Sequence, residues 1–134
     1  MKKFLAMMLA LVMALSLVAC GEQGDSQKGD DSASGDKVVK IGVFEPQSGD
    51  NGAGGKQEIL GMQYANKMIP TVTIGGEEYK VELVYADNAS SNDKAPTAAQ
   101  TLISQGVSVV LGSYGSGVSI AAGDTFSAAQ VPAI

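Results

Sequence analysis

The chain has 134 residues and a formal net charge of −5, with no histidine, no arginine and a single cysteine. An acidic chain without arginine is a poor binder of nucleic acid, and the lack of histidine removes the commonest general base and metal ligand. One cysteine also excludes an internal disulfide.

Residues 1–19 are predicted to be an export signal. Two lysines precede an apolar run, residues 4–19, which is interrupted only by Ser16 and is short for a membrane span. The run ends in L-V-A-C, which resembles the lipobox of bacterial lipoproteins, where cleavage precedes the cysteine and its sulfur is lipidated. The alternative is a free thiol beside an ordinary cleavage site. The basic start, the apolar run and the small residue before Cys20 favour lipidation, so we expect a lipoprotein anchored to the outer face of the cell membrane.

Residues 20–37 are predicted to be a disordered acidic tether. No apolar side chain after Cys20 in this stretch is larger than that of Ala33, so burial cannot offset the entropy cost of ordering it. As a flexible coil the tether would span roughly 20–25 Å. Removing the two lysines of the signal leaves seven lysines against fourteen acidic residues, a net charge of −7.

Residues 38–134 are predicted to fold as alternating strands and helices. Apolar runs predict strands, apolar residues spaced three and four apart predict helices, and Gly, Ser, Asn and Asp clusters predict loops. The predicted elements are strand Val38–Phe44, loop Pro46–Gly55, helix Lys56–Met68, a small hairpin arm Thr71–Ile74, strand Tyr79–Ala86, turn Asp87–Asn92, a helix with apolar positions from Ala95 to Ile103, strand Val107–Leu111, loop Gly112–Ser119, a helix with apolar positions from Val118 to Ala129, and the start of a fourth strand at Val131.

This order predicts an α/β fold with a parallel, doubly wound sheet. Ligands bind such sheets outside the carboxyl ends of the strands, where the strand order reverses. If the order is 2-1-3-4, the two loops at that point are Pro46–Gly55 and Gly112–Ser119. Both are rich in glycine and serine.

The strand–loop–helix around Gly112–Ser119 predicts a site for an anion. Free N–H groups at a helix N-terminus bind anions, and the hydroxyls of Ser113, Ser116 and Ser119 could add donors. Two alternatives stay open: the serines are only helix caps, and Tyr114 is a packing residue rather than a ligand wall. Glu45 could meet a ligand amine, but we expect it to face solvent.

Other chemistry lacks support in the sequence. Gly55–Gln57 fails the Walker A pattern, and Gly52–Gln57 fails the dinucleotide pattern at its last glycine. The acidic residues show no metal-ligand spacing, and no nucleophile–base pair can be built without histidine. We therefore expect no cofactor and no metal.

Three blocks resemble the branched-chain amino acid class of solute-binding proteins, the receptors of ABC importers. Lys40–Gly49 (K-I-G-V-F-E-P-Q-S-G) is similar to the first strand and loop of that family, and Gly55 and Gly61–Ala65 fit its helix pattern G-x-x-x-x-x-G-[AM]-x-x-A. Val81–Ser90 is similar to the second strand with its acidic turn. Leu102–Ser119 is similar to the third strand with its ligand-contacting loop.

The resemblance covers all of 38–134 and implies a type I periplasmic-binding fold, with two α/β lobes that close on a small solute. This chain would be the N-terminal part of lobe 1, truncated in strand 4. The serine matching Ser116 typically holds the carboxylate of the ligand, together with backbone groups of its loop. The implied partners are an amino acid-like solute and the permease and ATPase of an importer. The expected ligand-binding residues are Ser48, Tyr114, Gly115, Ser116, Gly117 and Ser119.

Two departures from the family pattern affect the site. Glu45 replaces the glycine that usually precedes the proline, and Gly54 stands where some members have a tyrosine that covers the ligand. The remaining ligand contacts are expected beyond Ile134, so we expect the chain to be a fragment. Two other functions stay open: an exported ligand-sensing lipoprotein without a transport role and, less favoured, a Rossmann-like enzyme.

Overall fold

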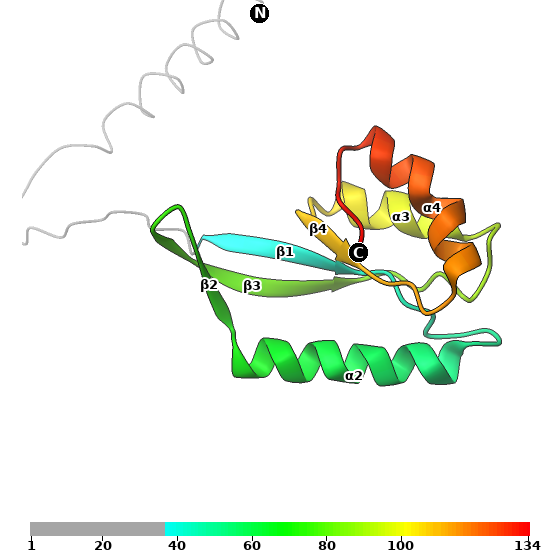
Figure 1. Ribbon diagram of the computed structural model, residues 1–134, viewed down its shortest axis with the longest axis horizontal. Coiled ribbons are helices and arrows are strands. Elements are labelled where there is room, and N and C mark those ends of the chain that lie inside the picture. The colour runs from blue at the N-terminus through cyan, green and yellow to red at the C-terminus, as the bar shows by residue number, and fades with distance from the viewer. Residues whose placement is uncertain (1–36) are drawn as a thin grey trace, which may run out of the picture. The chain divides into compact units, whose positions relative to one another are not determined.

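The computed structural model describes residues 37–134, so the predicted export signal and the tether up to residue 36 lie outside the described residues. The described part alternates strands and helices, as expected (Figure 1). Its elements are β1 (Val38–Val43), α2 (Gly52–Met68), β2 (Thr71–Ile74), β3 (Glu77–Tyr85), α3 (Ala95–Ser104), β4 (Val109–Leu111) and α4 (Ser116–Ala128).

The four strands form one sheet in the order β2-β3-β1-β4. β1 pairs in parallel with β3, from Val38 opposite Lys80 onward, and in parallel with β4 on its other side. A parallel bridge between Val110 and Ala133 extends the sheet beyond β4. The order that was assumed for the parallel strands is therefore the observed one, and the reversal of strand order lies between β1 and β4.

The small hairpin arm is also confirmed. β2 pairs antiparallel with β3, from Thr71 opposite Lys80 to Ile74 opposite Glu77. Gly75 and Gly76 form the turn, and both have positive φ angles, a conformation that glycine adopts without steric cost.

The loop prediction for Pro46–Gly55 is wrong at its end, because α2 begins at Gly52. Gly52, Gly54 and Gly55 lie in the first turn of the helix, whereas Gly49 stays in the loop before it. At Gly55 an added Cβ atom would overlap the backbone oxygen of Pro46. A glycine there lets the helix start directly against the loop that follows β1.

The loop prediction for Gly112–Ser119 is wrong in the same way, because α4 begins at Ser116. The backbone N–H groups of Val118 and Ser119 both donate to the carbonyl of Gly115, the residue that precedes the helix. The loop between β4 and α4, which we call the recognition loop, is thus only residues 112–115. Ser116 and Gly117 are the first two residues of α4.

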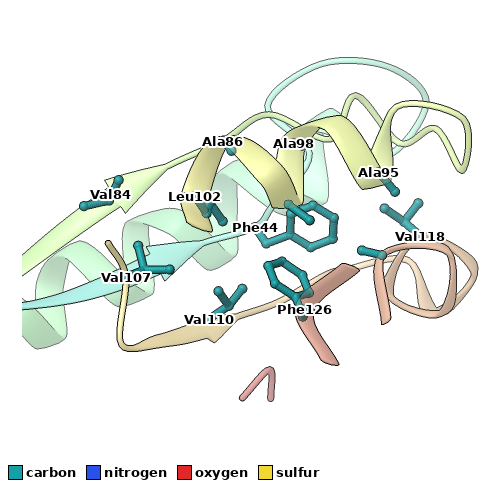
Figure 2. Close-up of a cluster of buried hydrophobic side chains, with 12 residues drawn as sticks. Phe44, Val84, Ala86, Ala95, Ala98, Leu102, Val107, Val110, Val118 and Phe126 are labelled. Carbon is teal, nitrogen blue, oxygen red and sulfur yellow. The ribbon is translucent and has the colours of Figure 1, made fainter. Parts of the chain in front are cut away.

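The main hydrophobic core lies between the sheet and the two helices α3 and α4, on the face opposite α2 (Figure 1). Phe44, just after β1, meets Phe126 of α4 with ring centroids 5.4 Å apart and planes at 90° (Figure 2). Such an edge-to-face pair adds about 0.5–1.5 kcal/mol beyond its burial. This contact holds the C-terminal part of α4 against the sheet, and the buried Val118 packs the first turn of the helix into the same core.

Helix α2 buries few of its residues. Gly52, Gly55 and Ile59 are buried, whereas the apolar residues Leu60, Tyr64 and Met68 are exposed. Within residues 37–134, no helix has the length and apolar character needed to cross a membrane.

Candidate ligand-binding site

Three loops meet at one edge of the sheet, after the carboxyl ends of β1, β3 and β4. Because these strands are parallel neighbours, residues 44–51, 86–94 and 112–115 emerge on the same side. Figure 1 shows them between the start of α2 and the start of α4. Side-chain hydrogen bonds join all three.

Asp87 joins the loop after β3 to the loop after β1. Its Oδ1 accepts backbone N–H groups from Gln47 at 2.8 Å, Ser48 at 3.3 Å and Ala89 at 2.8 Å, and its Oδ2 accepts the Ser48 hydroxyl at 2.6 Å. Burial alone would raise the pKa of this carboxyl, but the hydrogen bonds outweigh it and lower the pKa. The predicted site residue Ser48 therefore donates its hydroxyl to Asp87.

Asn88 connects the loops from beneath and was not predicted as a site residue. Its fully buried amide donates to the carbonyl of Phe44 at 2.9 Å and to the hydroxyl of Ser113 at 3.0 Å. Its Oδ1 accepts the backbone N–H of Ser90 at 3.0 Å. In the sequence Asn88 looks like any other polar turn residue, because its buried partners lie 44 and 25 residues away.

Glu45 contradicts the expectation that it faces solvent, because its side chain is 0% exposed. Oε2 accepts the backbone N–H of Tyr114 at 2.8 Å, and Oε1 is buried and has no hydrogen-bond partner in the described part of the chain. Burial, opposed by the Tyr114 bond and reinforced by the nearby Glu58, raises the pKa of Glu45 to about 7. The prediction was wrong because the loop after β4 folds over the carboxyl, which no local pattern around Glu45 shows.

The hydrogen bonds of the recognition loop leave two backbone donors at the start of α4. The N–H of Ser113 donates to the hydroxyl of Ser119 at 3.0 Å, and that of Tyr114 donates to Glu45. Among the described residues, the N–H groups of Ser116 and Gly117 and the exposed Ser116 hydroxyl have no hydrogen-bond partner. Of the predicted site residues, Ser116 and Gly117 are thus free to bind an anion, whereas Ser119 supports the loop.

Tyr114 lies beside these donors with 52% of its surface exposed. Its ring lies close to α2, because a Cβ atom at Gly54 would be 2.6 Å from its Cε2 atom. Gly54 therefore leaves space for the ring of Tyr114 between the recognition loop and the first turn of α2. A tyrosine at the mouth of the site is consistent with a ligand wall as well as with packing.

Two side-chain amides flank the start of α4. The amide nitrogen of Asn51 is 3.7 Å from the Cβ position of Gly115, and the amide oxygen of Asn92 is 3.3 Å from that of Gly117. The loops after β1 and β3 thus each place one asparagine beside the free donors. Neither residue was predicted as a site residue, since an isolated asparagine in a turn is usually a cap or a turn former.

The chemistry of this edge is that of a binding site. Within residues 37–134, no group of three or more possible ligands is arranged to hold a metal ion. The free groups are N–H donors and hydroxyls, without a base beside a nucleophile. They can recognise a carboxylate or another small anion through hydrogen bonds.

Residues 38–134 match the family model for periplasmic binding proteins. Comparison with curated proteins gives no match.

Several solved structures are similar to this chain. A leucine-binding protein from Thermotoga maritima is 32% identical with a TM-score of 0.64, and the match covers 72% of this chain and 27% of that one. The substrate-binding protein of a branched-chain amino acid transporter from Streptococcus pneumoniae, in complex with isoleucine, is 32% identical with a TM-score of 0.62, covering 72% and 28%. An ABC transporter solute-binding protein from R. palustris, in complex with benzoate, is 26% identical with a TM-score of 0.60, covering 72% and 26%. The chain spans about a quarter of the length of these relatives.

Proposed function

The chain belongs to the periplasmic binding protein family, and on that premise we propose that its protein is the solute-binding receptor of an ABC importer. Members of this family are extracytoplasmic receptors rather than enzymes. The fold supports the proposal, because the polar groups gather at the edge of the sheet where the strand order reverses. We propose a small polar solute of the branched-chain amino acid type.

The observation that carries this proposal is the pair of N–H groups at Ser116 and Gly117, which have no hydrogen-bond partner within residues 37–134, beside the exposed hydroxyl of Ser116. The solved relatives are named for, or contain, leucine, isoleucine and benzoate. All three solutes have a carboxylate on a compact apolar body. A carboxylate accepts hydrogen bonds from such donors, and the partial positive charge of the helix N-terminus favours it.

The other predicted site residues take different roles in this proposal. Tyr114 forms a wall for the apolar body of the solute, while Gly115 and Gly117 keep the backbone open to the carboxylate. Ser48 and Ser119 support the site, since the hydroxyl of Ser48 is donated to Asp87 and that of Ser119 accepts the N–H of Ser113.

Replacement of Ser116 tests the proposed site. In the full-length gene product, Ser116→Ala should weaken binding of L-leucine, L-isoleucine or benzoate by about 1.5–3 kcal/mol, the usual value of a hydrogen bond to a charged group. Calorimetry measures the change, and Ser127→Ala, an exposed serine near the end of α4, is the matched control. Equal affinities for the two variants would exclude Ser116 as a ligand residue.

We also propose that the protein is exported and anchored by a lipid on Cys20. This residue lies outside the described part of the chain, so the proposal rests on the lipobox-like L-V-A-C at residues 17–20. Cys20→Ser should release the protein from the membrane fraction or block its processing. A variant that stays in the membrane fraction with normal processing would contradict lipidation.

A further inference from the structure

Glu45 is a buried acid directly beneath the recognition loop. The loop covers it closely, because a Cβ atom on Gly112 would overlap its Oε1 atom. Oε2 accepts the N–H of Tyr114, and no residue from 37 to 134 forms a hydrogen bond with Oε1. A fully buried carboxylate oxygen without a donor is costly, so this site favours the protonated acid.

The titratable groups around Glu45 come from three elements. α2 contributes Glu58, an exposed carboxyl whose negative charge disfavours the ionised form of Glu45 and so helps to raise its pKa. The loop after β3 contributes Asp87, which is hydrogen bonded to the backbone of the loop that follows Glu45. The recognition loop contributes Tyr114, through its backbone N–H. None of the groups that shift Glu45 is a cation.

The buried carboxyl of Glu45 favours binding a proton. The proton removes a charge that burial disfavours and that the negative charge of Glu58 repels. Without it, a negative charge is buried behind the loop that must receive an anion.

We propose that Glu45 couples solute binding to a proton: the carboxylate of the solute binds the N-terminus of α4 most tightly when Glu45 is protonated. This inference rests on the proposed function, and it makes Glu45 a positioning residue that does not touch the solute. Ionised Glu45 would bind the Tyr114 N–H more strongly, but that N–H is not among the donors left for the solute. The repulsion between the Glu45 carboxylate and the carboxylate of the solute is therefore the larger effect.

The expected size of this effect follows from the distance. Tyr114 N lies 2.8 Å from Glu45, and the free donors are two and three residues further along, so the carboxylates of Glu45 and of the solute lie within roughly 15 Å of each other. At an effective protein dielectric constant of about 20, charge repulsion at that distance lowers affinity on the order of tenfold.

The test is calorimetry of L-leucine, L-isoleucine and benzoate at about pH 6 and about pH 8, on either side of the Glu45 pKa of about 7. The full-length wild type should bind about tenfold more tightly at the lower pH and take up protons near neutrality. Glu45→Gln keeps an oxygen for the Tyr114 N–H but cannot ionise, so its affinity should not change with pH. Glu82→Gln, an exposed residue of β3, is the charge-matched control and should behave as the wild type.

Each outcome decides the matter. If wild type and Glu45→Gln have the same pH dependence while Ser116→Ala still weakens binding, the proton coupling is wrong and the proposed function stands. If none of the three solutes binds the wild type, the proposed function fails, and an NMR titration without solute decides the inference. If the Glu45 carboxyl ionises near its ordinary pKa of 4.5, the inference is wrong. The inference is supported if Glu45 ionises near pH 7, if the Tyr114 amide signal shifts over the same pH range, and if Glu58→Gln lowers the pKa of Glu45.

Discussion

The hydroxyl of Ser48 donates a hydrogen bond to Oδ2 of Asp87 at 2.6 Å and so joins two loops 39 residues apart in the sequence. The backbone N–H of Ser48 also donates to the same carboxyl, at Oδ1. Ser90 adds a further link, since its hydroxyl donates to the carbonyl of Ser48 at 3.1 Å. The loops after β1 and β3 are therefore one hydrogen-bonded unit, on which the site depends.

Removing the Asp87 carboxylate should loosen this unit. Asp87→Ala leaves three backbone N–H groups and one hydroxyl without their acceptor. Water can replace part of these bonds because the side chain is exposed, so we expect a loss of about 2 kcal/mol in the free energy of unfolding. Chemical denaturation measures it, with Asp93→Ala, also exposed and in the same loop, as the control. Equal stability of the two variants would show that these bonds add little.

The same carboxyl predicts a loss of stability in acid. The folded state lowers the pKa of Asp87, so the folded state binds fewer protons than the unfolded state around the ordinary value of 3.8. The contribution of Asp87 is present above that value and is lost as the pH falls through the lowered pKa. Below about pH 4, the free energy of unfolding should thus change less with pH for Asp87→Asn than for the wild type. Identical slopes would contradict the assignment.

The fold could be predicted because its signals are local. Apolar runs such as V-V-K-I-G-V and helical spacing such as Ala95, Ala98, Ala99 and Leu102 lie within single elements, and those helical positions are all buried. The hairpin could also be predicted, because Gly75 and Gly76 separate two segments whose residues favour β-strands. The starts of α2 and α4 could not be predicted, because glycine and serine are typical of loops. Only the neighbouring atoms in the folded structure show where a glycine is required.

The site could be predicted only in part. The candidate loop was located because it lies between a predicted strand and a predicted helix. The resemblance to the family then singled out Ser116, whose role as a ligand residue stays a prediction. Glu45 and Asn88 were missed because their burial depends on residues brought from the far side of the chain, 69 positions away for Tyr114 and 44 for Phe44. Composition makes an acid and an amide in turns look like surface residues.

Two serines of α4 should differ in their effect on folding. Ser119→Ala removes the acceptor for the Ser113 N–H and should lower the free energy of unfolding by about 1 kcal/mol. Ser116→Ala removes an exposed hydroxyl without a hydrogen-bond partner among the described residues and should leave stability nearly unchanged. Thermal and chemical denaturation of the two variants measure this difference. A larger loss for Ser116→Ala would mean that Ser116 is a helix cap.

Two adjacent glycines of α2 should also differ. Gly55→Ala forces a methyl group into the backbone of Pro46 and should cost about 3 kcal/mol, as overpacking does. Gly54→Ala meets the half-exposed ring of Tyr114, which can rotate away, and alanine favours the helix by about 0.5–1 kcal/mol. Gly54→Ala should therefore keep or gain stability while displacing the ring. Equal losses in denaturation would mean that Tyr114 is held rigidly.

Glu45 should make stability fall as the pH rises. Its pKa is 4.5 ordinarily and about 7 in the folded protein, so between these values the folded state binds more protons than the unfolded state. The free energy of unfolding that Glu45 contributes is fully present below 4.5 and is lost as the pH passes through about 7. Glu45→Gln keeps the acceptor for the Tyr114 N–H and removes this titration. Above neutral pH it should be more stable than the wild type by about 2 kcal/mol, and the difference should vanish in mild acid. Denaturation across this range, with Glu82→Gln as the control, measures the effect. A Glu45→Gln variant that is less stable than the wild type above neutral pH would mean that the ionised carboxylate holds the recognition loop.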